Sequence, residues 1–538
     1  MTSTSSVSGL SSGIDWRSMI DQLRAAEHRS IDLVLQQKSA SENKIKAWQE
    51  LNTKLLSLKT AAEKLNRAQG FNLLTSALSS SSATDPNELL SATIGATGEV
   101  GSFGLEVLWT ARAQKISSQG FSSQTAPLGA GYAGTLQING RELTVTADDS
   151  LADVRNKINN LNNGEDATRV TASIVSYSTT DQRLILTSQN EGAAGIDLQP
   201  VGLPDLEAAF GFNEIQPGRD ASLEVDGVPV TRSSNTITDL LPGITLNLKK
   251  AEEGTTVTLN ISRDLDGVTG LITDFVEQYN QVVDFIRNQS SYNKDAGEAG
   301  GVLFGDGTLR SVKKDLVALV INPVGGVAPE FSILGMAGIK LDNQGKLSVN
   351  ETTLRGHLES HFEDIKKLFI ADGFSTTGNL KYITHGLKTQ PGSYAVNVTQ
   401  AYAPGVDIAG TINGEAAVGS GSTLTGAPGT SVEGLAVSYT GAATGEVGHV
   451  TLTLGVAETF SRLLSNLTDP YGGYVANKQT SLQSQIDGME AKIERMESRL
   501  DSRMEIITRQ YVAMEKSLGQ MQSLSSWLSS QIVSLNNQ

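Results

Sequence analysis

A long heptad-like pattern near the end of the chain constrains the fold more than any other feature of the sequence. Apolar residues recur at spacings of three and four from Leu482 to Met521, and Leu528, Ile532 and Leu535 resume the pattern after a small slip. This spacing is typical of a helix that packs an apolar stripe, here called the seam, against another helix. At ~1.5 Å per residue such a helix is on the order of 80 Å long, which no compact domain can contain. We therefore expect it to be shared with other helices.

The charges beside this seam are segregated along the helix. Acidic residues follow seam positions by one residue, and basic residues precede them by one residue. The acidic flank consists of Glu490, Glu494, Glu497 and Asp501, and the basic flank consists of Lys492, Arg495, Arg499 and Arg503. Flanks of this kind select the partner and its orientation in helical assemblies. A solvated face with alternating charge is the other interpretation, but the segregation over several turns favours a specified helical partner.

The N-terminal region carries a related pattern. After a Ser/Gly-rich start, apolar residues from Ile45 to Leu65 follow the same spacing and predict a second leg helix. No cleavable secretory signal is visible, because the first cation is Arg17 and no compact apolar core precedes it. We therefore expect the start to be a working part of the mature protein. Residues 76–86 predict a linker, since they combine a run of Ser with Asp-Pro.

The seam residues of the two leg helices form one predicted set. The predicted coiled-coil seam consists of Ile45, Trp48, Leu55, Leu58, Ile486, Met489, Ile493, Met496, Leu500, Ile507, Tyr511 and Met514.

Between the two ends the hydrophobic period changes to two. Residues 221–230, 243–250 and 254–261 alternate apolar and polar side chains between Gly turns, which predicts antiparallel strands. Residues 148–159 predict a short helix, with Ser150 as its N-cap and Asp153 three residues later. Helical patterning then returns over residues 267–370.

A second β-rich segment follows and repeats part of the first. Residues 389–461 contain no Lys or Arg and are rich in Gly, Thr and Val, which predicts an inserted β module. GSFGLEV (101–107) is echoed by GSYAVNV (392–398), and AGTLQING (133–140) by AGTING (409–414). Both repeats end in Ile-Asn-Gly, and Asn-Gly suits a tight hairpin. A duplicated β motif explains two matches in the same order better than chance similarity.

These segments together predict an α+β multidomain chain. Its long terminal helices form a coiled-coil leg, and its antiparallel β head domains are joined by a β insert. The predicted segments are residues 1–75 (N-terminal disordered segment and leg helix), 76–266 (β-rich head of two subdomains), 267–373 (helical return leg), 374–460 (inserted β module) and 461–538 (C-terminal coiled-coil helix and flexible tail).

Composition narrows the classes of function. The net charge of −16 argues against nucleic-acid binding, which needs a clustered cationic surface. No cysteine is present, so disulfides, thiolate metal sites and thiol catalysis are excluded. No apolar run approaches the roughly 20 residues that a membrane helix requires, so we expect no membrane insertion.

No arrangement of residues predicts catalysis, a metal site or a cofactor. His357 and His361 lie one helical turn apart, but Leu358 stands where the zinc-protease motif has Glu, and no third ligand is evident. Residues 340–351 resemble a calcium loop only in part, because Gln344 and Lys346 occupy positions that need oxygen ligands. A β-turn between two short strands is the better prediction there. We expect no enzyme activity and no cofactor.

Several motifs together resemble one known family. SGLSSGID (8–15) before a long helix, the head strand GSFGLEV, and LFGDGTLR (303–310) are similar to motifs of the flagellar filament cap proteins, the hook-associated protein 2 family. Residues 133–198 resemble the flagellin/hook IN motif, and the C-terminal QYVAMEKSLGQMQSLSSWL also resembles the family. The resemblance implies a small ring-shaped oligomer at the filament tip, with leg helices toward the filament and β heads forming a plate.

The resemblance also implies function, partners and location. It implies a protein that guides flagellin polymerisation and prevents loss of subunits, and that meets hook–filament junction proteins. It further implies export through the flagellar type III channel without a cleaved signal, and a cytosolic export chaperone bound around residues 500–538. The alternatives are another axial protein, such as flagellin or a junction protein, and an adhesin whose β heads bind host glycans or mucin.

The two ends of the chain supply the predicted flagellin contacts. A segment that becomes ordered only on binding loses conformational entropy, which weakens the binding and makes it reversible. A cap that moves as each subunit is added requires reversible binding. We expect apolar contacts made only on assembly, with intrachain helix pairing as the alternative. The predicted contact residues are Leu10, Ile14, Ile20, Leu23, Leu528, Ile532 and Leu535.

Overall fold

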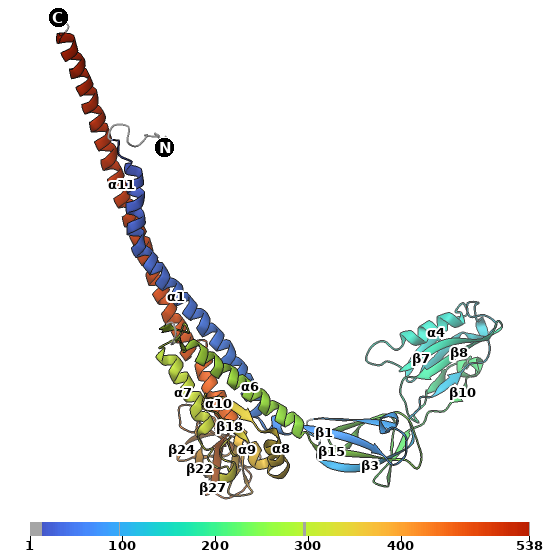
Figure 1. Cartoon of the computed structure of the whole chain (residues 1–538). Helices are drawn as coiled ribbons and strands as arrows, with labels where there is room; N and C mark the ends of the chain where they lie inside the picture. Colours follow the sequence, from blue (N-terminus) through green and yellow to red (C-terminus); the bar gives the residue numbers. More distant parts are fainter. Residues whose placement is uncertain (1–12, 96, 294–296, 537–538) are drawn as a thin grey trace. The chain divides into compact units, whose positions relative to one another are not determined.

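The computed structural model describes residues 13–95, 97–293 and 297–536 and divides the chain into two compact units. The first unit combines the N-terminal residues up to Phe71 with the chain from Asp266 onward, and the second comprises Asn72–Leu265 (Figure 1). The two ends of the chain therefore belong to one unit, while the predicted β-rich head folds separately.

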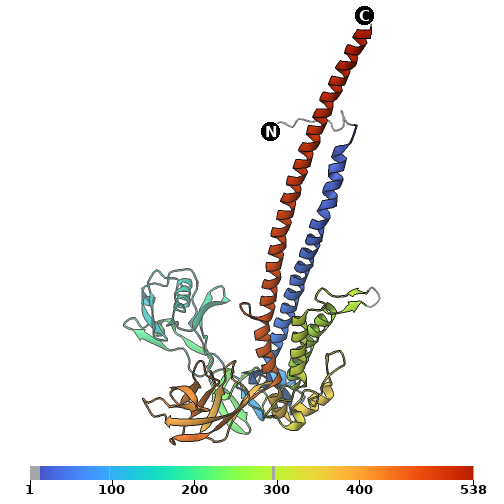
Figure 2. The ribbon, with the colours of Figure 1, turned by 90° about the vertical axis from the view of Figure 1, so that its left-hand side faces the viewer.

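Two long helices run side by side through the first unit. α1 (Trp16–Leu65) and α11 (Tyr474–Asn536) lie against each other in opposite directions, and α11 continues past the start of α1 (Figure 1, Figure 2). α1 begins where the Asp15 side chain accepts a hydrogen bond from the Ser18 amide at 3.2 Å. Both helices are long because their seams continue without a Pro to interrupt them.

Shorter helices pack around the end of this pair where α1 finishes and α11 begins (Figure 1). α1 packs against α10 there, and the rings of Phe275 in α6 and Phe460 in α10 meet edge to face at 5.1 Å. Trp48, Leu51 and Leu58 of α1 are fully buried in this region, which we call the base (α1 residues 47–65). The remaining helices of the unit are α2 (Ala68–Phe71), α6 (Leu265–Gln289), α7 (Gly307–Ile321), α8 (Glu351–Ser360), α9 (Phe362–Phe369) and α10 (Val456–Thr468).

The inserted β module is an eight-stranded antiparallel sheet with its own apolar core. Its strand order is β20-β27-β22-β23-β24-β25-β26-β21. Val396, Ile412, Leu424 and Val437 are fully buried in its core. The strands are β20 (Ala371–Ser375), β21 (Leu380–Thr384), β22 (Gly392–Gln400), β23 (Ala409–Ile412), β24 (Glu415–Ser420), β25 (Thr423–Gly426), β26 (Ala436–Tyr439) and β27 (Gly445–Leu454).

A buried charge network joins the segment between β21 and β22 of this module to α10 and to Asn66, which follows α1. Glu458 of α10 accepts hydrogen bonds from Arg462 Nε at 2.7 Å, from Asn66 Nδ2 at 2.8 Å and from His385 Nε2 at 3.2 Å. Arg462 also donates to the backbone oxygen of Gly386 at 3.0 Å. Burial by itself raises the pKa of Glu458, but the hydrogen bonds from His385 and Arg462 outweigh it and hold that pKa below its usual value.

Short hairpins complete the first unit. β18 (Ile339–Leu341) and β19 (Leu347–Val349) pair around a turn capped by Asp342, as predicted for residues 340–351. The hydrogen bonds that Asp342 accepts from the Lys346 and Gln344 amides lower its pKa. β16 (Tyr292–Asn293) pairs with β17 (Glu298–Ala299), and a short 3-10 turn covers Pro329–Phe331.

The second unit contains two apolar cores. In the first, Leu105, Leu223 and Leu259 from three neighbouring strands are fully buried. Its sheets have the orders β1-β15-β3-β11-β12 and β13-β14-β2. The elements are β1 (Leu74–Ser80), α3 (Pro86–Leu89), β2 (Leu90–Ile94), β3 (Gly101–Trp109), β11 (Ala221–Val225), β12 (Val228–Arg232), β13 (Thr236–Leu241), β14 (Ile244–Leu248) and β15 (Thr256–Arg263).

The second core is built around the predicted short helix. α4 (Leu151–Asn160) begins at a capping box in which Ser150 and Asp153 exchange hydrogen bonds, and its apolar face is buried, as predicted. The sheets have the orders β10-β4-β8-β7 and β6-β5-β9. The other elements are β4 (Lys115–Ser117), a 3-10 turn (Ala130–Tyr132), β5 (Gly134–Ile138), β6 (Arg141–Val145), β7 (Val170–Ser178), β8 (Asp181–Ser188), β9 (Leu198–Val201), α5 (Leu206–Phe210) and β10 (Asn213–Gln216).

Both Ile-Asn-Gly repeats form the predicted tight hairpins. Asn139 and Gly140 have φ of 44° and 82°, and Asn413 and Gly414 have φ of 53° and 79°. Positive φ at both central residues is the conformation that Asn-Gly turns adopt between paired strands. The likeness is local, however. β22 and β23 pair within one sheet, whereas the corresponding β3 and β5 lie in different sheets.

Two sequence-based predictions are wrong, the first of them in part. Residues 76–80 are not a linker, because β1 pairs along its whole length with β15 and places Leu78 opposite Leu259, and only residues 81–85 connect β1 to α3 without helix or strand. That pairing joins segments far apart in the sequence, so local Ser content does not reveal it. The C-terminal tail, which was predicted to be flexible, is helical to Asn536, because no Pro or Gly after Gly519 interrupts the helix.

Candidate assembly surface

The seam between α1 and α11 is the first part of the candidate surface. Ile486, Ile493 and Leu500 of α11 are buried, and Trp16, Ile20, Ile31 and Val34 of α1 are buried with them. The predicted seam residues Met489, Met496, Ile507 and Tyr511 pack against this cluster and are partly buried. Trp48, Leu55 and Leu58 are fully buried in the base, while Ile45 and Met514 are half-buried. We call residues 482–511 of α11, with the facing part of α1, the paired segment.

Sequence reasoning missed the N-terminal part of this seam. Ile31 and Val34 continue the three/four spacing of α1, but Lys38 and Ser41 stand at the next two positions and obscure it. Trp16 was missed too, and its ring stacks on Tyr511 with centroids 5.8 Å apart and planes 7° apart. The spacing before Ile45 was the signal that could have extended the prediction.

Ion pairs join the two helices on both sides of the seam. On the acidic flank, Glu490 accepts from Lys38 Nζ at 2.7 Å, and Asp501 accepts from Arg24 Nη2 at 2.5 Å. The hydrogen bond to Glu490 raises the pKa of Lys38. On the basic flank, Arg503 Nη1 reaches Glu27 Oε1 at 2.5 Å. These pairs fix the antiparallel register of α1 on α11, and being exposed they add little stability.

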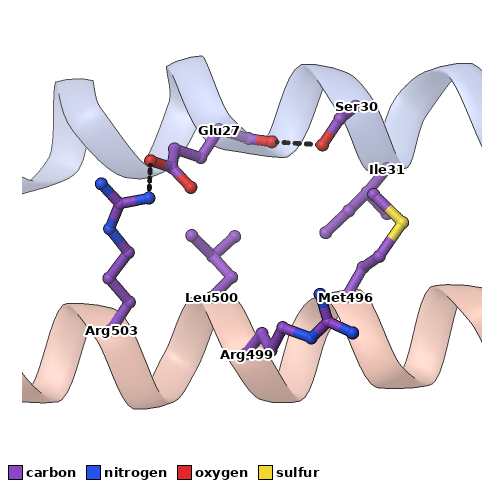
Figure 3. A pocket seen from close by; sticks show the side chains of 7 residues that line it. All are labelled: Glu27, Ser30, Ile31, Met496, Arg499, Leu500 and Arg503. Atoms are coloured by element: carbon purple, nitrogen blue, oxygen red, sulfur yellow. Dashed lines mark hydrogen bonds and ion pairs between the residues drawn. The ribbon is translucent and has the colours of Figure 1, made fainter.

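A groove of about 340 Å³ lies along the basic flank. Figure 3 shows Ile31, Met496 and Leu500 between the two helices, with Arg503 reaching across to Glu27. Arg499 lines the same groove and forms no ion pair in the part of the chain that the structure describes. The groove therefore combines an apolar floor with an available guanidinium group.

Beyond Tyr511 the seam loses its partner helix. In residues 512–536, which we call the tip, every side chain from Met521 to Val533 is exposed. Trp527 is 56% exposed, Leu528 48% and Ile532 59%, although they lie on a helix with an apolar pattern. An amphipathic helix normally covers such residues, so the tip presents an apolar face that the described residues leave open.

The predicted flagellin contacts fall into three groups. Ile14, Leu528 and Ile532 are exposed. Ile20 is buried and Leu23 is partly buried against the paired segment, so for these two the structure supports intrachain helix pairing, not contacts made only on assembly. Leu10 lies outside the described residues. Leu535 lies in α11, where the structure describes the backbone alone.

The candidate metal residues have other surroundings. The rings of His357 and His361 lie 5.1 Å and 4.8 Å from the ring of Phe331. Within residues 13–95, 97–293 and 297–536, no three His, Asp or Glu side chains are grouped as metal ligands would be. Among the same residues, no helix is both long enough and apolar enough to span a membrane.

Comparison with protein families identifies the chain. Residues 12–114 match the model of the flagellar hook-associated protein 2 N-terminus, and residues 218–523 match that of its C-terminus. The chain belongs to the flagellar hook-associated protein 2 family. This is a family of flagellar cap proteins, and none of the comparisons supports the adhesin alternative.

Individual relatives of this family align over most of the chain. The chain is 30% identical over 427 residues to flagellar hook-associated protein 2 of Escherichia coli O157:H7, covering 72% of this chain and 88% of that protein. It is 27% identical over 462 residues to the Campylobacter jejuni protein, covering 72% and 70%.

A solved structure shares the fold. The D1-D2-D3 domains of the flagellar cap protein FliD from Escherichia coli align with a TM-score of 0.53 and 21% identity, covering 81% of this chain and 99% of that one. The predicted α+β multidomain class, with long terminal helices and antiparallel β domains, is thus confirmed.

Proposed function

We propose that this chain caps the tip of the bacterial flagellar filament, where it promotes and guides flagellin polymerisation and prevents the loss of subunits. It acts as a small ring-shaped oligomer without enzymatic activity, and it also meets the hook–filament junction proteins. A cytosolic export chaperone holds the α11 end until the chain leaves through the flagellar type III system. Family membership supports this proposal.

One structural observation carries the contact with flagellin. The part of α11 that extends beyond the start of α1 exposes a set of apolar side chains. They are Met521, Leu524, Trp527, Leu528 and Ile532. Apolar side chains gathered on one helix end are typical of a binding surface. A partner helix from flagellin covers this face when the cap engages the filament. Because only one helix end is buried, the contact can be released as each new subunit is inserted.

The test replaces two exposed apolar residues of the tip. Leu528→Ser with Ile532→Ser removes apolar surface from the tip without changing any residue of the paired segment. In cells lacking the native protein, we expect this variant to leave filaments short and flagellin monomers in the medium. Leu33→Ser with Leu56→Ser is the matched control, because these residues are 61% and 43% exposed on α1 and lie outside the tip.

Folding is checked separately from capping. Both variants should keep the helical content and thermal stability of the wild type, since exposed positions usually change stability by less than about 0.5 kcal/mol. If the tip variant restores full-length filaments as well as the wild type does, the tip is not the flagellin contact. If the control fails equally, the effect is not specific to the tip.

A further inference from the structure

The two flanks of the paired segment differ in the charges that remain unpaired. On the acidic flank, Glu490 and Asp501 bind Lys38 and Arg24, which leaves Glu494 and Glu497 without an ion pair among the described residues. Both glutamates are exposed. One flank of the leg therefore presents two available carboxylates.

The opposite flank presents available cations. Arg503 is bound to Glu27, whereas Lys492, Arg495 and Arg499 are exposed and form no ion pair within the part of the chain that the structure describes. Three unpaired cations along one side of the helix raise the local positive electrostatic potential. A partner with acidic side chains at matching spacing lowers this potential by pairing with them.

Both sets of charges occupy the same stretch of α11. Glu494 and Glu497 lie within the interval from Lys492 to Arg499, so the two flanks are level with each other along the helix. At ~100° per residue, Glu494 and Arg499 point about 140° apart around the axis. The leg thus carries opposite charges on two sides at one height.

Apolar surface accompanies the charges on the basic flank. The groove there has Ile31, Met496 and Leu500 at its floor. A second groove, of about 400 Å³, lies farther along α11, where Asp501 and Met504 line it together with Arg24, and it does not include Glu494 or Glu497. A helix docked along the basic flank therefore covers apolar atoms in addition to matching charges.

We infer that the legs of neighbouring copies dock side by side, with Glu494 and Glu497 of one copy against Lys492, Arg495 and Arg499 of the next. The occupant of the basic groove is therefore a second copy of this chain. Because the two surfaces differ, the contact is heterologous, and such contacts close into a ring when rotation alone relates the copies. The two charged surfaces lie at the same height along α11. Copies can therefore be related by rotation about an axis parallel to the legs, with no translation along that axis. The inference rests on the proposed ring assembly and names the surface that builds it.

Charge reversal tests the contact in the full-length protein. The first variant is Arg495→Glu with Arg499→Glu, and the second is Glu494→Lys with Glu497→Lys. The third combines all four substitutions, which reverses the sign of four of the five contact residues and leaves Lys492 unchanged. Arg310→Glu with Lys314→Glu on α7 is the matched control, since these exposed cations have the same spacing away from the leg.

The measurement is the mass in solution by light scattering over a range of protein and salt concentrations. We expect the wild type and the control to form multiples of the 56.9 kDa chain. Each two-residue flank variant should need at least about tenfold more protein for half-association, because like charges then face each other. The four-residue variant should regain wild-type association. Salt should weaken the wild-type assembly, since screening acts within about 8 Å at physiological ionic strength.

Three results overturn the inference. It fails if either flank variant associates like the wild type, if the four-residue variant does not recover, or if the wild type is monomeric under every condition. Circular dichroism shows whether each variant keeps its helices, and the recovery test remains decisive if a two-residue variant folds poorly. Filament growth in cells is scored in parallel. A wild type that caps filaments while its flank variants keep their mass leaves the proposed function standing and removes this contact.

Discussion

The base and the tip of the terminal helices have the same apolar spacing but opposite exposure. In the base, Trp48, Leu55 and Leu58 are fully buried where α1 packs against α10. In the tip, Leu528 and Ile532 are about half exposed on a single helix. The paired segment lies between these extremes, with Leu500 buried by one partner helix. The seam therefore specifies contact along its whole length, but among the described residues only part of it has a partner.

The largest expected loss of stability comes from a substitution in the base. Trp48→Ala leaves a cavity and should lower the free energy of unfolding by about 3–5 kcal/mol. Trp48→Phe keeps most of the ring volume and should cost less than about 1.5 kcal/mol, because the indole Nε1 is buried without a hydrogen-bond partner among the described residues. Hydrogen exchange of amides in α1 and α10 measures both. Equal costs for the two variants would show that volume does not hold the base together.

The next effect removes the charge that anchors the β module to the base. Glu458→Gln leaves Arg462 and His385 without their carboxylate and should cost about 3 kcal/mol at neutral pH, as breaking a buried ion pair does. The measurement is denaturant unfolding followed by circular dichroism. A loss below about 0.5 kcal/mol would mean that the network does not stabilise this attachment.

The same residue predicts a pH dependence with a definite sign. The pKa of Glu458 is lowered in the folded chain, so its stabilisation is present above its unfolded pKa of about 4.3 and is lost as the pH falls through the lower folded pKa. Wild-type stability should therefore decline in acid more steeply than that of Glu458→Gln. Parallel acid limbs for the two proteins would contradict this assignment.

A smaller effect is expected in the paired segment. Leu500→Ala removes a side chain that one partner helix covers, and it should cost about 2 kcal/mol, at the low end for buried leucines. Since α1 and α11 pair alone here, the loss should appear as faster hydrogen exchange in residues 482–511 and leave the β module unchanged. Uniform destabilisation of the first unit would show that the leg and base unfold together.

The smallest effect on stability belongs to the tip. Leu528→Ser with Ile532→Ser should change the free energy of unfolding by less than about 0.5 kcal/mol while impairing capping. Thermal unfolding and filament length in cells measure the two properties. Large destabilisation of the isolated protein would mean that the tip already has an intrachain partner, and the contrast with the base would disappear.

Local patterns accounted for many elements of the fold. The Ser150 capping box, the two Asn-Gly hairpins and the strands within residues 221–230, 243–250 and 254–261 follow from residues close together in sequence, and each was predicted, whereas β13 was not. The seam residues of α11 were also predicted, because helical periodicity needs only one chain segment. The pairing of β1 with β15 was not, since its two strands are separated by most of the second unit.

The features of the candidate surface also fall into two groups, those that the sequence predicts and those that depend on long-range packing. The sequence by itself determined that α11 has an apolar seam with acidic and basic flanks, because these depend on residue spacing and the helical repeat. Only the tertiary structure decided that, among the residues it describes, Ile20 is covered while Leu528 is exposed, and Glu490 has an ion pair while Glu494 has none. Burial and ion pairing depend on where α1 begins beside α11 and in which register it lies, and that geometry is set by long-range packing in the base.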